Sequence, residues 1–489
     1  MKLEKMFSYL KDFVVKTGKG VVFNNEIEDI TVDSRKVSRN SAFFAVTGTK
    51  LDGHDYIKDA FANGASVVFG EKPLNVEKYI RVTDVEKVLS VISEPFYGFP
   101  QKNISSTAIT GTNGKTTVAH IIHKMLSGKM KTGLVSTTCC RTGDREFDIP
   151  NTTPFIWDWY RILAEMRDSS VQHFVSEVSS HALQQGRVKG SLFNTAVFTG
   201  FSRDHIDFHG SMDAYFNSKK RLFEDYILSG GRAVINADDE KSGEIADAAE
   251  KNGAEVSFFS MADPDAHLFV EKYSVTEQKT LKVKMRYNSE VYELNLPMVG
   301  VFNIRNAMAS VLAVSEYLSI NEALTVLEKG VKVPGRMERV SSDANVFVDY
   351  AHTPDALENV LESLEEFKSG GRIITVFGAG GDRDKGKRPQ MGAIVEKYSD
   401  ISIITNDNPR TENPLEIIDN LSSGMVENCF IVIPDRKKAI KKAVECMGEK
   451  DIVLIAGKGH EEYQINGNVK NYFSDRKEAL DAMKIGESR

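Results

Sequence analysis

The segment from Thr107 to Leu126 constrains the fold of this chain more than any other, because it joins an apolar run to an amphipathic helix through glycines. The connecting loop reads Gly111-Thr-Asn-Gly-Lys115-Thr-Thr117. Glycines let a backbone approach a phosphate group closely, and the N-terminus of the following helix adds partial positive charge. A strand, a loop of this kind and a helix together predict a site for a nucleoside triphosphate.

The side chains of this loop support the same interpretation. Lys115 supplies a full positive charge, and the hydroxyl of Thr116 can bind Mg²⁺. Ile109 stands where the standard Walker A motif has a glycine, so the loop is a shorter variant. The alternative is a glycine-rich turn that happens to precede a helix. The helix is predicted from the spacing of its apolar residues, Val118, Ile121, Ile122, Met125 and Leu126.

Length and composition exclude several classes of protein. A chain of 489 residues is too long for one core, and about three domains are expected. A net charge of −7 argues against a nucleic-acid-binding surface. No apolar run approaches the roughly 18 residues of a membrane helix, and the N-terminus does not resemble a secretory signal. Four cysteines without a paired CxxC pattern are interpreted as thiols of a cytoplasmic protein: Cys139, Cys140, Cys429 and Cys446.

Apolar runs that alternate with helical stretches predict mostly parallel sheets with helices on both faces. A polar stretch broken by Gly and Pro at 98–103 is predicted to be a linker, and a second break lies at 333–336. Ligands bind at the carboxyl ends of strands in open α/β sheets, so polar residues at those ends are the candidates for chemistry. Strands are predicted at 41–46, 65–69, 134–137, 173–176, 195–199, 373–377, 401–405, 430–433 and 452–455.

Two predicted strand ends in the middle of the chain carry candidate metal ligands. Glu177 follows the run 173–176 and could hold Mg²⁺ directly or through water, with an ordinary surface carboxylate as the alternative. The segment 204–209 brings two histidines and two carboxylates within six residues. It is interpreted either as a metal-binding segment or as a polar loop with a helix cap.

Three further polar features have no settled role from the residues alone. The cations 219–221 lie on a helix predicted to begin near Asp213, and their composition favours a solvated face. Asn303 and Asn306 could read a purine edge or hold a turn. Asp349 ends an apolar run and precedes a second polar cluster.

Three loops in the last third of the chain match the two charged ends of an amino acid. The loop 377–385 contains no GxGxxG and is predicted to lead into no helix, so a dinucleotide fingerprint is rejected in favour of a loop that displays Arg383 for a carboxylate. Arg410 follows the strand predicted at 401–405, and Glu461 follows the strand predicted at 452–455. Two arginines and a glutamate on three adjacent strands suit a carboxylate and an ammonium group. Ordinary loop chemistry is the alternative for any one of these loops.

Taken in order, these motifs resemble the Mur ligases and, within that family, the MurE branch. The resemblance implies an α/β protein of three domains, with a UDP-binding domain at 1–102, a central P-loop ATPase domain with a parallel sheet at 103–335, and a Rossmann-like amino-acid-binding domain at 336–489. The motifs that carry it cover the whole chain: 33–35, 111–117, 151–154, 177–181, 204–209, 300–306, 334–336, 349–352, 380–387, 407–410 and 457–461.

The resemblance also implies a reaction. An enzyme of this kind joins a diamino acid to UDP-N-acetylmuramoyl-L-alanyl-D-glutamate in cytoplasmic peptidoglycan synthesis, with ATP as co-substrate and an acyl phosphate as intermediate. Two Mg²⁺ ions and a monomeric chain without nucleic-acid or membrane partners are expected. Lys219 matches a lysine that CO₂ carbamylates, which replaces its interpretation as a solvated cation. The implied catalytic residues are Lys115, Glu177, His205 and Lys219, and the implied metal ligands are Thr116, Glu177, His205 and Lys219 as N6-carboxylysine.

The matching positions imply three binding sets. ATP would contact Gly111, Thr112, Asn113, Gly114, Lys115, Thr116, Thr117, Asn303, Arg336 and Asp349. The UDP-sugar-peptide would contact Val32, Ser34, Thr49, Lys50, Leu51, Asn151, Thr152, Thr153, Ser179, Gln185 and Arg187. The amino acid would contact Arg383, Asp407, Asn408, Pro409, Arg410, Gly457 and Glu461.

Alternatives remain at the level of substrate and of class. The form Asp407-Asn-Pro-Arg410 favours meso-diaminopimelate, since lysine enzymes usually lack that arginine, yet the α-carboxylate of lysine could also bind it. A ligase similar to folylpolyglutamate synthase should lack the domain around 33–35 and the motif at 407–410. A non-catalytic nucleotide switch would bind ATP without turnover that depends on an amino acid.

Overall fold

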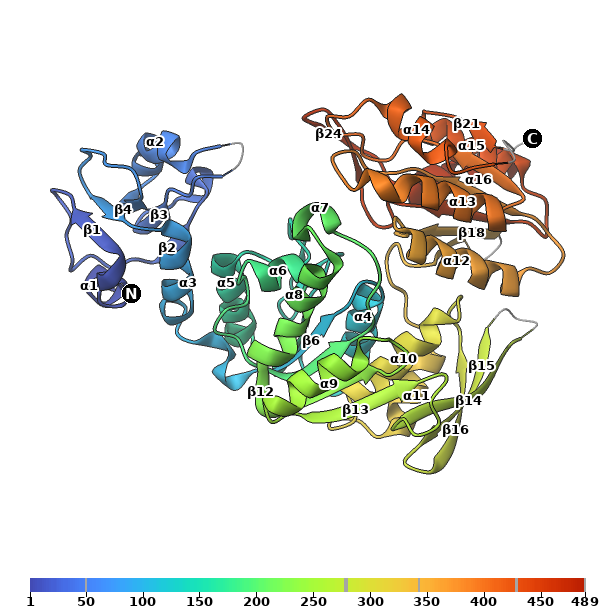
Figure 1. Ribbon diagram of the computed structural model, residues 1–489. Coiled ribbons are helices and arrows are strands. Elements are labelled where there is room, and N and C mark those ends of the chain that lie inside the picture. Colours follow the sequence, from blue (N-terminus) through green and yellow to red (C-terminus); the bar gives the residue numbers. More distant parts are fainter. Residues whose placement is uncertain (49–50, 277–279, 342–343, 427–429, 488–489) are drawn as a thin grey trace. The chain divides into compact units, whose positions relative to one another are not determined.

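The computed structural model describes residues 1–489 apart from 49–50, 277–279, 342–343, 427–429 and 488–489 (Figure 1). The chain divides into two compact units. Unit 1 comprises Met1–Ser106, Met130–Phe174 and Val178–Leu192, and unit 2 comprises Thr107–Lys129, Val175–Glu177 and Phe193–Arg489. Within the described residues, no helix is both long enough and apolar enough to cross a membrane.

Unit 1 begins with a five-stranded sheet in which only the first strand is antiparallel to its neighbour. Every residue of β3 (Ser41–Phe44) is buried, as in sheets that are covered on both faces. The sheet order is β1 (Val14–Thr17), β5 (Tyr79–Val82), β4 (Ala65–Gly70), β3 (Ser41–Phe44) and β2 (Asp29–Thr31). The helices of this part are α1 (Leu3–Leu10), α2 (Ile57–Ala62) and α3 (Val85–Phe96).

The rest of unit 1 contains two helices and three short antiparallel strands. Helix α5 (Ile156–Asp168) buries Trp159, whose indole N–H donates to Ser191 Oγ at 2.8 Å, so its polar atom is satisfied inside the core. The predicted linker is partly ordered, because Pro100–Asn103 form a 3₁₀ turn. The other elements are α6 (Ser180–Gln184), β7 (Thr132–Val135), β8 (Cys140–Arg141) and β9 (Glu146–Phe147).

The first part of unit 2, called the central lobe here, comprises β6, α4, the end of β10 (His173–Glu177) and the elements from β11 to α11. Strands β6, β11, β12, β13 and β14 are parallel, and β14, β15 and β16 form an antiparallel extension that the sequence interpretation did not include. In the sheet order, β10 is followed by β6 (Ser105–Thr110), β11 (Phe193–Phe198), β12 (Ile227–Asn236), β13 (Glu255–Ser260), β14 (Leu268–Val275), β15 (Leu281–Tyr287) and β16 (Glu290–Leu296). Its helices are α4 (Lys115–Leu126), α7 (Ile206–His209), α8 (Met212–Asp225), α9 (Ser242–Lys251), α10 (Phe302–Ala313) and α11 (Ile320–Glu328).

The second part of unit 2, the C-terminal lobe, is a six-stranded sheet with helices on both faces (Figure 1). Only its first strand is antiparallel. The order is β17 (Glu338–Ser341), β18 (Ala344–Asp349), β22 (Ile452–Ala456), β19 (Ile373–Phe377), β20 (Ile401–Ile404) and β21 (Phe430–Val432).

Alternation along β19 explains the two layers of helices. Ile373 and Phe377 pack against α12 (Pro354–Phe367), α13 (Arg388–Tyr398) and α14 (Pro414–Ser422), whereas Ile374 and Val376 pack against α15 (Arg436–Cys446) and α16 (Asp475–Glu487). A hairpin of β23 (Tyr463–Asn466) and β24 (Val469–Tyr472) follows β22 in the chain. The strands predicted at 373–377, 401–405 and 452–455 are adjacent, as expected.

Candidate functional site

The predicted phosphate loop connects β6 to α4 and requires glycine at two positions. Gly114 precedes α4 with φ of 84°, and a Cβ there would lie 2.6 Å from Asn306 Oδ1. A Cβ on Gly111 would lie 1.9 Å from Thr199 Oγ1. The loop therefore has the close-packed glycine backbone that a phosphate-binding turn needs.

The ammonium group of Lys115 lies over this loop. Lys115 Nζ donates to the carbonyl oxygens of Gly111 and Thr112, each at 2.9 Å. Burial lowers the pKa of Lys115 below its ordinary value, and the nearby Arg336 guanidinium lowers it further. The two cations thus concentrate positive charge beside the loop, where a phosphoryl group would carry negative charge.

Thr116 connects the loop to two other predicted site residues. Its hydroxyl donates to Glu177 Oε2 at 3.0 Å and accepts from Arg336 Nη2 at 3.2 Å. Glu177 ends β10 (His173–Glu177) and is fully buried, so the alternative of a surface carboxylate is wrong. The Arg336 guanidinium also lies 4.3 Å from the centre of the Tyr350 ring. A hydroxyl and a carboxylate side by side are hard oxygen donors that fit Mg²⁺.

Lys219 belongs to the same cluster, and the expectation of a solvated face is wrong for it. Its side chain is 1% exposed, and its Nζ donates to Gly111 O at 2.7 Å. The Nζ also lies 4.4 Å from the centre of the Tyr215 ring. Burial lowers the pKa of Lys219 well below its ordinary value, with a further contribution from Lys115. The next lysine, Lys220, is instead partly exposed and pairs with Glu224 on the helix surface.

The segment 204–209 does not gather its own histidines and carboxylates. His205 Nε2 lies 3.3 Å from Asp204 Oδ2, and Lys387 Nζ lies 3.9 Å from Asp204 Oδ1. Burial would raise the pKa of Asp204, but His205, His352 and Lys387 hold it at about 2. In the part of the chain that the structure describes, no three His, Cys, Asp or Glu side chains could hold a metal together. The Thr116 hydroxyl beside Glu177 and a modified Lys219 are the further candidate oxygen donors at this site.

Two of the predicted nucleotide contacts outside the loop, Asn303 and Asp349, are buried and bonded within the protein, whereas Arg336 is half-buried. Asn303 Nδ2 donates to Val299 O at 2.7 Å, and Asn306 Nδ2 donates to Asn303 Oδ1 at 2.9 Å. Both asparagines lie in the first turns of α10, and the nucleotide contact stays a prediction. Asp349 accepts from the backbone N–H groups of Met337 and Ala351, and burial raises the pKa of its carboxyl.

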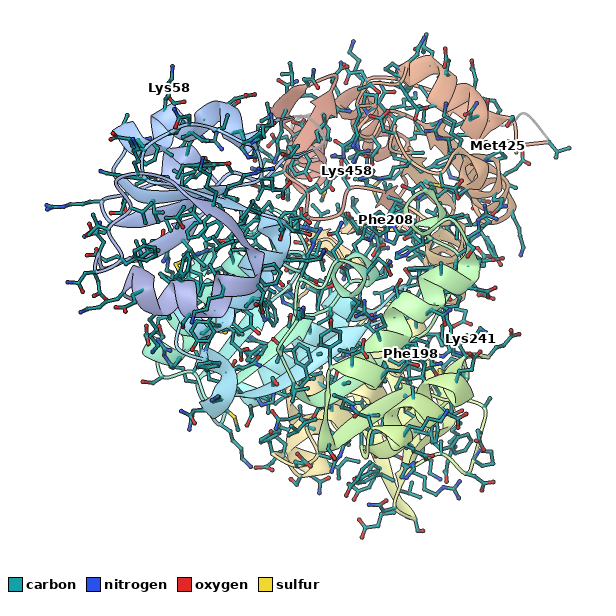
Figure 2. All side chains as sticks on the ribbon, turned by 60° about the vertical axis from the view of Figure 1, so that its left-hand side comes forward. Lys58, Phe198, Phe208, Lys241, Met425 and Lys458 are labelled. Atoms are coloured by element: carbon teal, nitrogen blue, oxygen red, sulfur yellow. The ribbon has the colours of Figure 1, made fainter. Side chains whose placement is uncertain are left out.

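In the C-terminal lobe, the structure brings together the loops after β20 and β22. Asn408 Nδ2 donates to Glu461 Oε2 at 2.9 Å. Lys458, labelled in Figure 2, is fully buried and donates to Asn408 Oδ1 and Glu461 Oε2, each at 3.2 Å. A Cβ on Gly457 would lie 2.8 Å from Asp407 Oδ2. Although burial raises it, Lys458 and Arg436 hold the pKa of Asp407 below its usual value.

Arg410 lies between the loop after β19 and the β23–β24 hairpin. Its φ is 52°, its N–H donates to Ile465 O at 3.2 Å, and its carbonyl accepts from Gly467 N at 2.7 Å. Its Nη1 donates to Gly381 O at 2.7 Å. Arg383 is exposed and donates to Asp382 O at 3.1 Å, so it is near this cluster without bonding to it. Pro409 is buried in the same loop.

The prediction that the loop 377–385 leads into no helix is wrong. A 3₁₀ turn (Lys385–Lys387) continues directly into α13, with Pro389 in its first turn. Sequence reasoning also missed the buried cations of this lobe, among them Lys458, Arg388 and Arg436. The proline was an available signal for the helix start. Lys458 has a partner in its own loop, Glu461, but nothing local indicates that it also bonds to Asn408 or that Arg388 bonds to Glu412.

The predicted contacts of the UDP-sugar-peptide lie in unit 1. Arg187 donates through Nη1 to Thr153 O and through Nε to Gln185 Oε1, both at 2.8 Å. Ser179 N donates to Thr153 Oγ1 at 3.1 Å, so four of these residues form one cluster. Beside it, Thr152 Oγ1 accepts from Thr137 Oγ1 at 3.0 Å, while Asn151 lies in the preceding bend.

The predicted contacts in the first hundred residues are only partly described. Ser34 is buried in a 3₁₀ turn, and Asn63 Nδ2 donates to its carbonyl at 2.9 Å. Val32 is half-buried, and Leu51 is exposed. Thr49 and Lys50 lie outside the described residues.

Three family models match the chain in order, and two curated relatives match nearly all of it. The models are the Mur ligase family catalytic domain at 26–114, the Mur ligase middle domain at 109–314 and the Mur ligase, glutamate ligase domain at 335–459. The UDP-N-acetylmuramoyl-L-alanyl-D-glutamate--2,6-diaminopimelate ligase of Clostridium tetani is 37% identical, covering 96% of this chain and 97% of the relative. The protein of the same name from Gloeobacter violaceus is 40% identical, covering 95% of each. The chain belongs to the Mur ligase family.

Solved structures agree with this assignment. A structure of a UDP-N-acetylmuramoyl-L-alanyl-D-glutamate--2,6-diaminopimelate ligase is 29% identical and covers 100% of this Mur ligase and 99% of its own chain, with a TM-score of 0.64. MurF from Acinetobacter baumannii, 16% identical, covers 99% and 98% with a TM-score of 0.71, which shows the fold alone. This Mur ligase is thus an ATP-dependent α/β enzyme of three domains.

Proposed function

We propose that this Mur ligase joins meso-diaminopimelate to UDP-N-acetylmuramoyl-L-alanyl-D-glutamate, with ATP as co-substrate. The observation that carries the proposal is the set of relatives named for this reaction, which match nearly the full chain at 36–40% identity. Arg410 in the form Asp407-Asn-Pro-Arg410 supports diaminopimelate over lysine, because an arginine suits a second carboxylate. The substrates are those of a cytoplasmic step, and we propose that the enzyme acts there as a monomer.

We propose domain boundaries close to 102 and 335. The first domain would hold the UDP end of the substrate through Val32, Ser34 and the segment 49–51. The cluster of Thr153, Ser179, Gln185 and Arg187, with Asn151 and Thr152 beside it, would hold the muramoyl-peptide. Asn303, Arg336 and Asp349 would contact the nucleotide, and the loops with Arg383, Arg410 and Glu461 would hold the amino acid.

The chemistry begins with transfer of the γ-phosphoryl group of ATP to the side-chain carboxylate of the D-glutamate, which gives ADP and an acyl phosphate. The amine of the incoming amino acid attacks the acyl carbon and loses a proton, and the tetrahedral intermediate expels inorganic phosphate. Lys115 would balance the negative charge that develops on the transferring group. Two Mg²⁺ ions, when bound through Thr116, Glu177, His205 and modified Lys219, would supply further charge stabilisation.

Lys219 is proposed to act as a carbamate. Only a neutral amine adds to CO₂, giving the carbamate and releasing a proton, and burial beside Lys115 favours that neutral form. The product is an anion with two oxygen donors in place of a cation, which suits a metal ligand. Carbon NMR after exposure to ¹³C-labelled CO₂ tests this directly, since a carbamate resonance should appear in the wild type and be absent from Lys219→Ala.

The reaction itself is tested by phosphate release with ATP, Mg²⁺ and UDP-N-acetylmuramoyl-L-alanyl-D-glutamate. Meso-diaminopimelate, L-lysine and D-lysine are supplied in separate reactions, and the mass of each product is measured by mass spectrometry. Turnover with diaminopimelate and a product of the expected mass supports the proposal. Efficient turnover with lysine alone would show that lysine, and not diaminopimelate, is the substrate. Absence of turnover with all three amino acids would refute the proposed reaction.

A further inference from the structure

An ion pair between Arg388 and Glu412 connects the loops that carry Arg383 and Arg410, and the proposed function assigns no role to this pair. Arg388, the first residue of α13, is 1% exposed. Its guanidinium donates through Nη2 to Glu412 Oε1 at 2.9 Å and through Nη1 to Glu412 Oε2 at 3.0 Å. A bidentate pair of this kind fixes orientation as well as distance.

Glu412 is also bonded to the loop that follows β19. The backbone N–H of Asp382 donates to Glu412 Oε1 at 2.5 Å, and Arg388 Nη2 donates to Gly380 O at 3.2 Å. The Thr411 hydroxyl donates to Asp382 Oδ1 at 2.7 Å. The residues immediately after Arg410 are therefore held to the loop 380–385 by side chains from both.

This junction determines where the Arg410 side chain lies. Arg410 Nη1 donates to Gly381 O, and Gly381 N donates to Asn408 O at 2.9 Å, so the two loops meet directly at Gly381. A Cβ on Gly381 would lie 1.9 Å from Pro409 O, which leaves no room for the loops to approach differently with a side chain there. The hairpin holds the Arg410 backbone, and the loop 380–385 holds its guanidinium.

We propose that Glu412 is a positioning residue for amino-acid selectivity. Through Arg388 and Asp382 it holds the loop under Arg410, so that the guanidinium meets a second carboxylate on the incoming amino acid. Diaminopimelate and lysine differ at this end, where one presents a carboxylate beside its ammonium and the other presents the ammonium alone. A guanidinium attracts the first and repels the second, provided that it is held in place. The inference rests on the proposed function.

The test compares Glu412→Gln with the wild type in steady-state kinetics. The amide keeps the shape but loses the charge that binds Arg388. The KM for meso-diaminopimelate should rise by roughly tenfold, because a small displacement of a positioning group costs about that much. The KM values for ATP and for the UDP-substrate should not change, and selectivity for diaminopimelate over L-lysine should fall. Glu416→Gln, an exposed carboxylate on the adjacent α14, is the matched control and should leave all constants unchanged.

A double variant separates positioning from a general structural role. If Glu412 acts through Arg410, then Arg410→Ala with Glu412→Gln should be no worse for diaminopimelate than Arg410→Ala alone. Independent, multiplying effects would overturn the proposal, as would an equal rise in the KM for ATP. Should Glu412→Gln fail to fold, Thr411→Val removes one exposed bond of the same junction. It should raise the KM for diaminopimelate alone by a smaller factor, and unchanged constants would count against the proposal. A wild type without turnover would refute the proposed function rather than this inference.

Discussion

The phosphate loop and the amino-acid loops both lie at the carboxyl ends of parallel strands, but the phosphate loop has a core of local contacts, whereas the amino-acid loops are joined to one another by contacts between distant segments. Lys115 bonds to carbonyl oxygens three and four residues away, whereas Asn408 bonds to Glu461 across 53 residues. One contiguous segment supplies the phosphate-loop backbone and Lys115, and Glu177, Lys219 and Arg336 then bond to it from other elements. The amino-acid site exists only when β19, β20 and β22 lie side by side. The phosphate loop can be recognised from local sequence, while the amino-acid site depends on the fold of the whole lobe.

The largest expected effect comes from Lys219, which joins the phosphate loop from a distant helix. Lys219→Ala should lower kcat by roughly a thousandfold, because several kcal/mol of charge stabilisation would be lost with a metal ligand. Added short carboxylates should restore part of the activity by supplying the missing oxygen donors. Phosphate release in the presence and absence of acetate measures both effects. Lys220→Ala, on the exposed side of the same helix, is the control and should retain the wild-type rate.

The next effect concerns the buried pair under the amino-acid loops. Arg436 and Asp475 are the first residues of α15 and α16, and both side chains are 0% exposed. Arg436 donates to the Asp475 carboxylate through Nε and Nη2, each at 2.7 Å. Arg436 also donates to Ala456 O at 2.9 Å, at the end of β22. Arg436→Met should lower the free energy of unfolding by about 3 kcal/mol, because a buried carboxylate loses its partner.

Urea unfolding followed by circular dichroism measures this loss. Lys437→Met removes an ion pair between an exposed lysine and the half-buried Glu478 from the next position, and it should destabilise the fold far less than Arg436→Met. Equal losses for the two variants would show that the C-terminal loops do not depend on the buried pair.

A smaller effect, confined to one substrate, is expected from Arg410. Arg410→Ala should raise the KM for the diamino acid by roughly 30-fold, the effect of removing one member of a bonded charge pair. The KM for ATP should remain near the wild-type value, since Arg410 contacts the loop after β19 and the hairpin rather than the phosphate loop. An equal rise in the KM values for ATP and for the diamino acid would show that Arg410 does not belong to the amino-acid site alone. It would also show that the phosphate loop and the amino-acid loops do not act separately.

Buried parallel strands were predictable because they are continuous apolar runs. The run 373–377 has the bounds of β19, and the helical spacing after the phosphate loop ends where α4 ends. The antiparallel strands β14 to β16 were missed. They are half-exposed, with alternating burial and many charged residues, so no apolar run marks them.

The burial of Lys219 could not be predicted from composition, but it could be predicted from helical periodicity. Three consecutive cations favour solvent, yet helical spacing puts Lys219 on the same face as Tyr215 and Leu222, which are both buried. The partners of Glu412 and Asn408 had no such signal, since each depends on a loop from another strand. The motif resemblance therefore identified the candidate residues, and the tertiary structure was needed to show which of them touch.

The smallest expected effect is the pH dependence of the junction behind Arg410. Bonds from Arg388 hold the pKa of Glu412 at about 2, below the ordinary value of 4.5. Because the folded-state pKa is the lower one, the ionised carboxylate stabilises the fold above pH 4.5, and this contribution is lost as the pH falls through about 2. The difference in free energy of unfolding between wild type and Glu412→Gln should be constant above pH 4.5 and should shrink below it. Urea titrations at decreasing pH measure this difference, with Glu416→Gln as the control. A difference that does not change with pH would mean that Glu412 acts through its shape rather than its charge. The amino-acid loops would then depend less on ion pairs between distant segments than their comparison with the phosphate loop suggests.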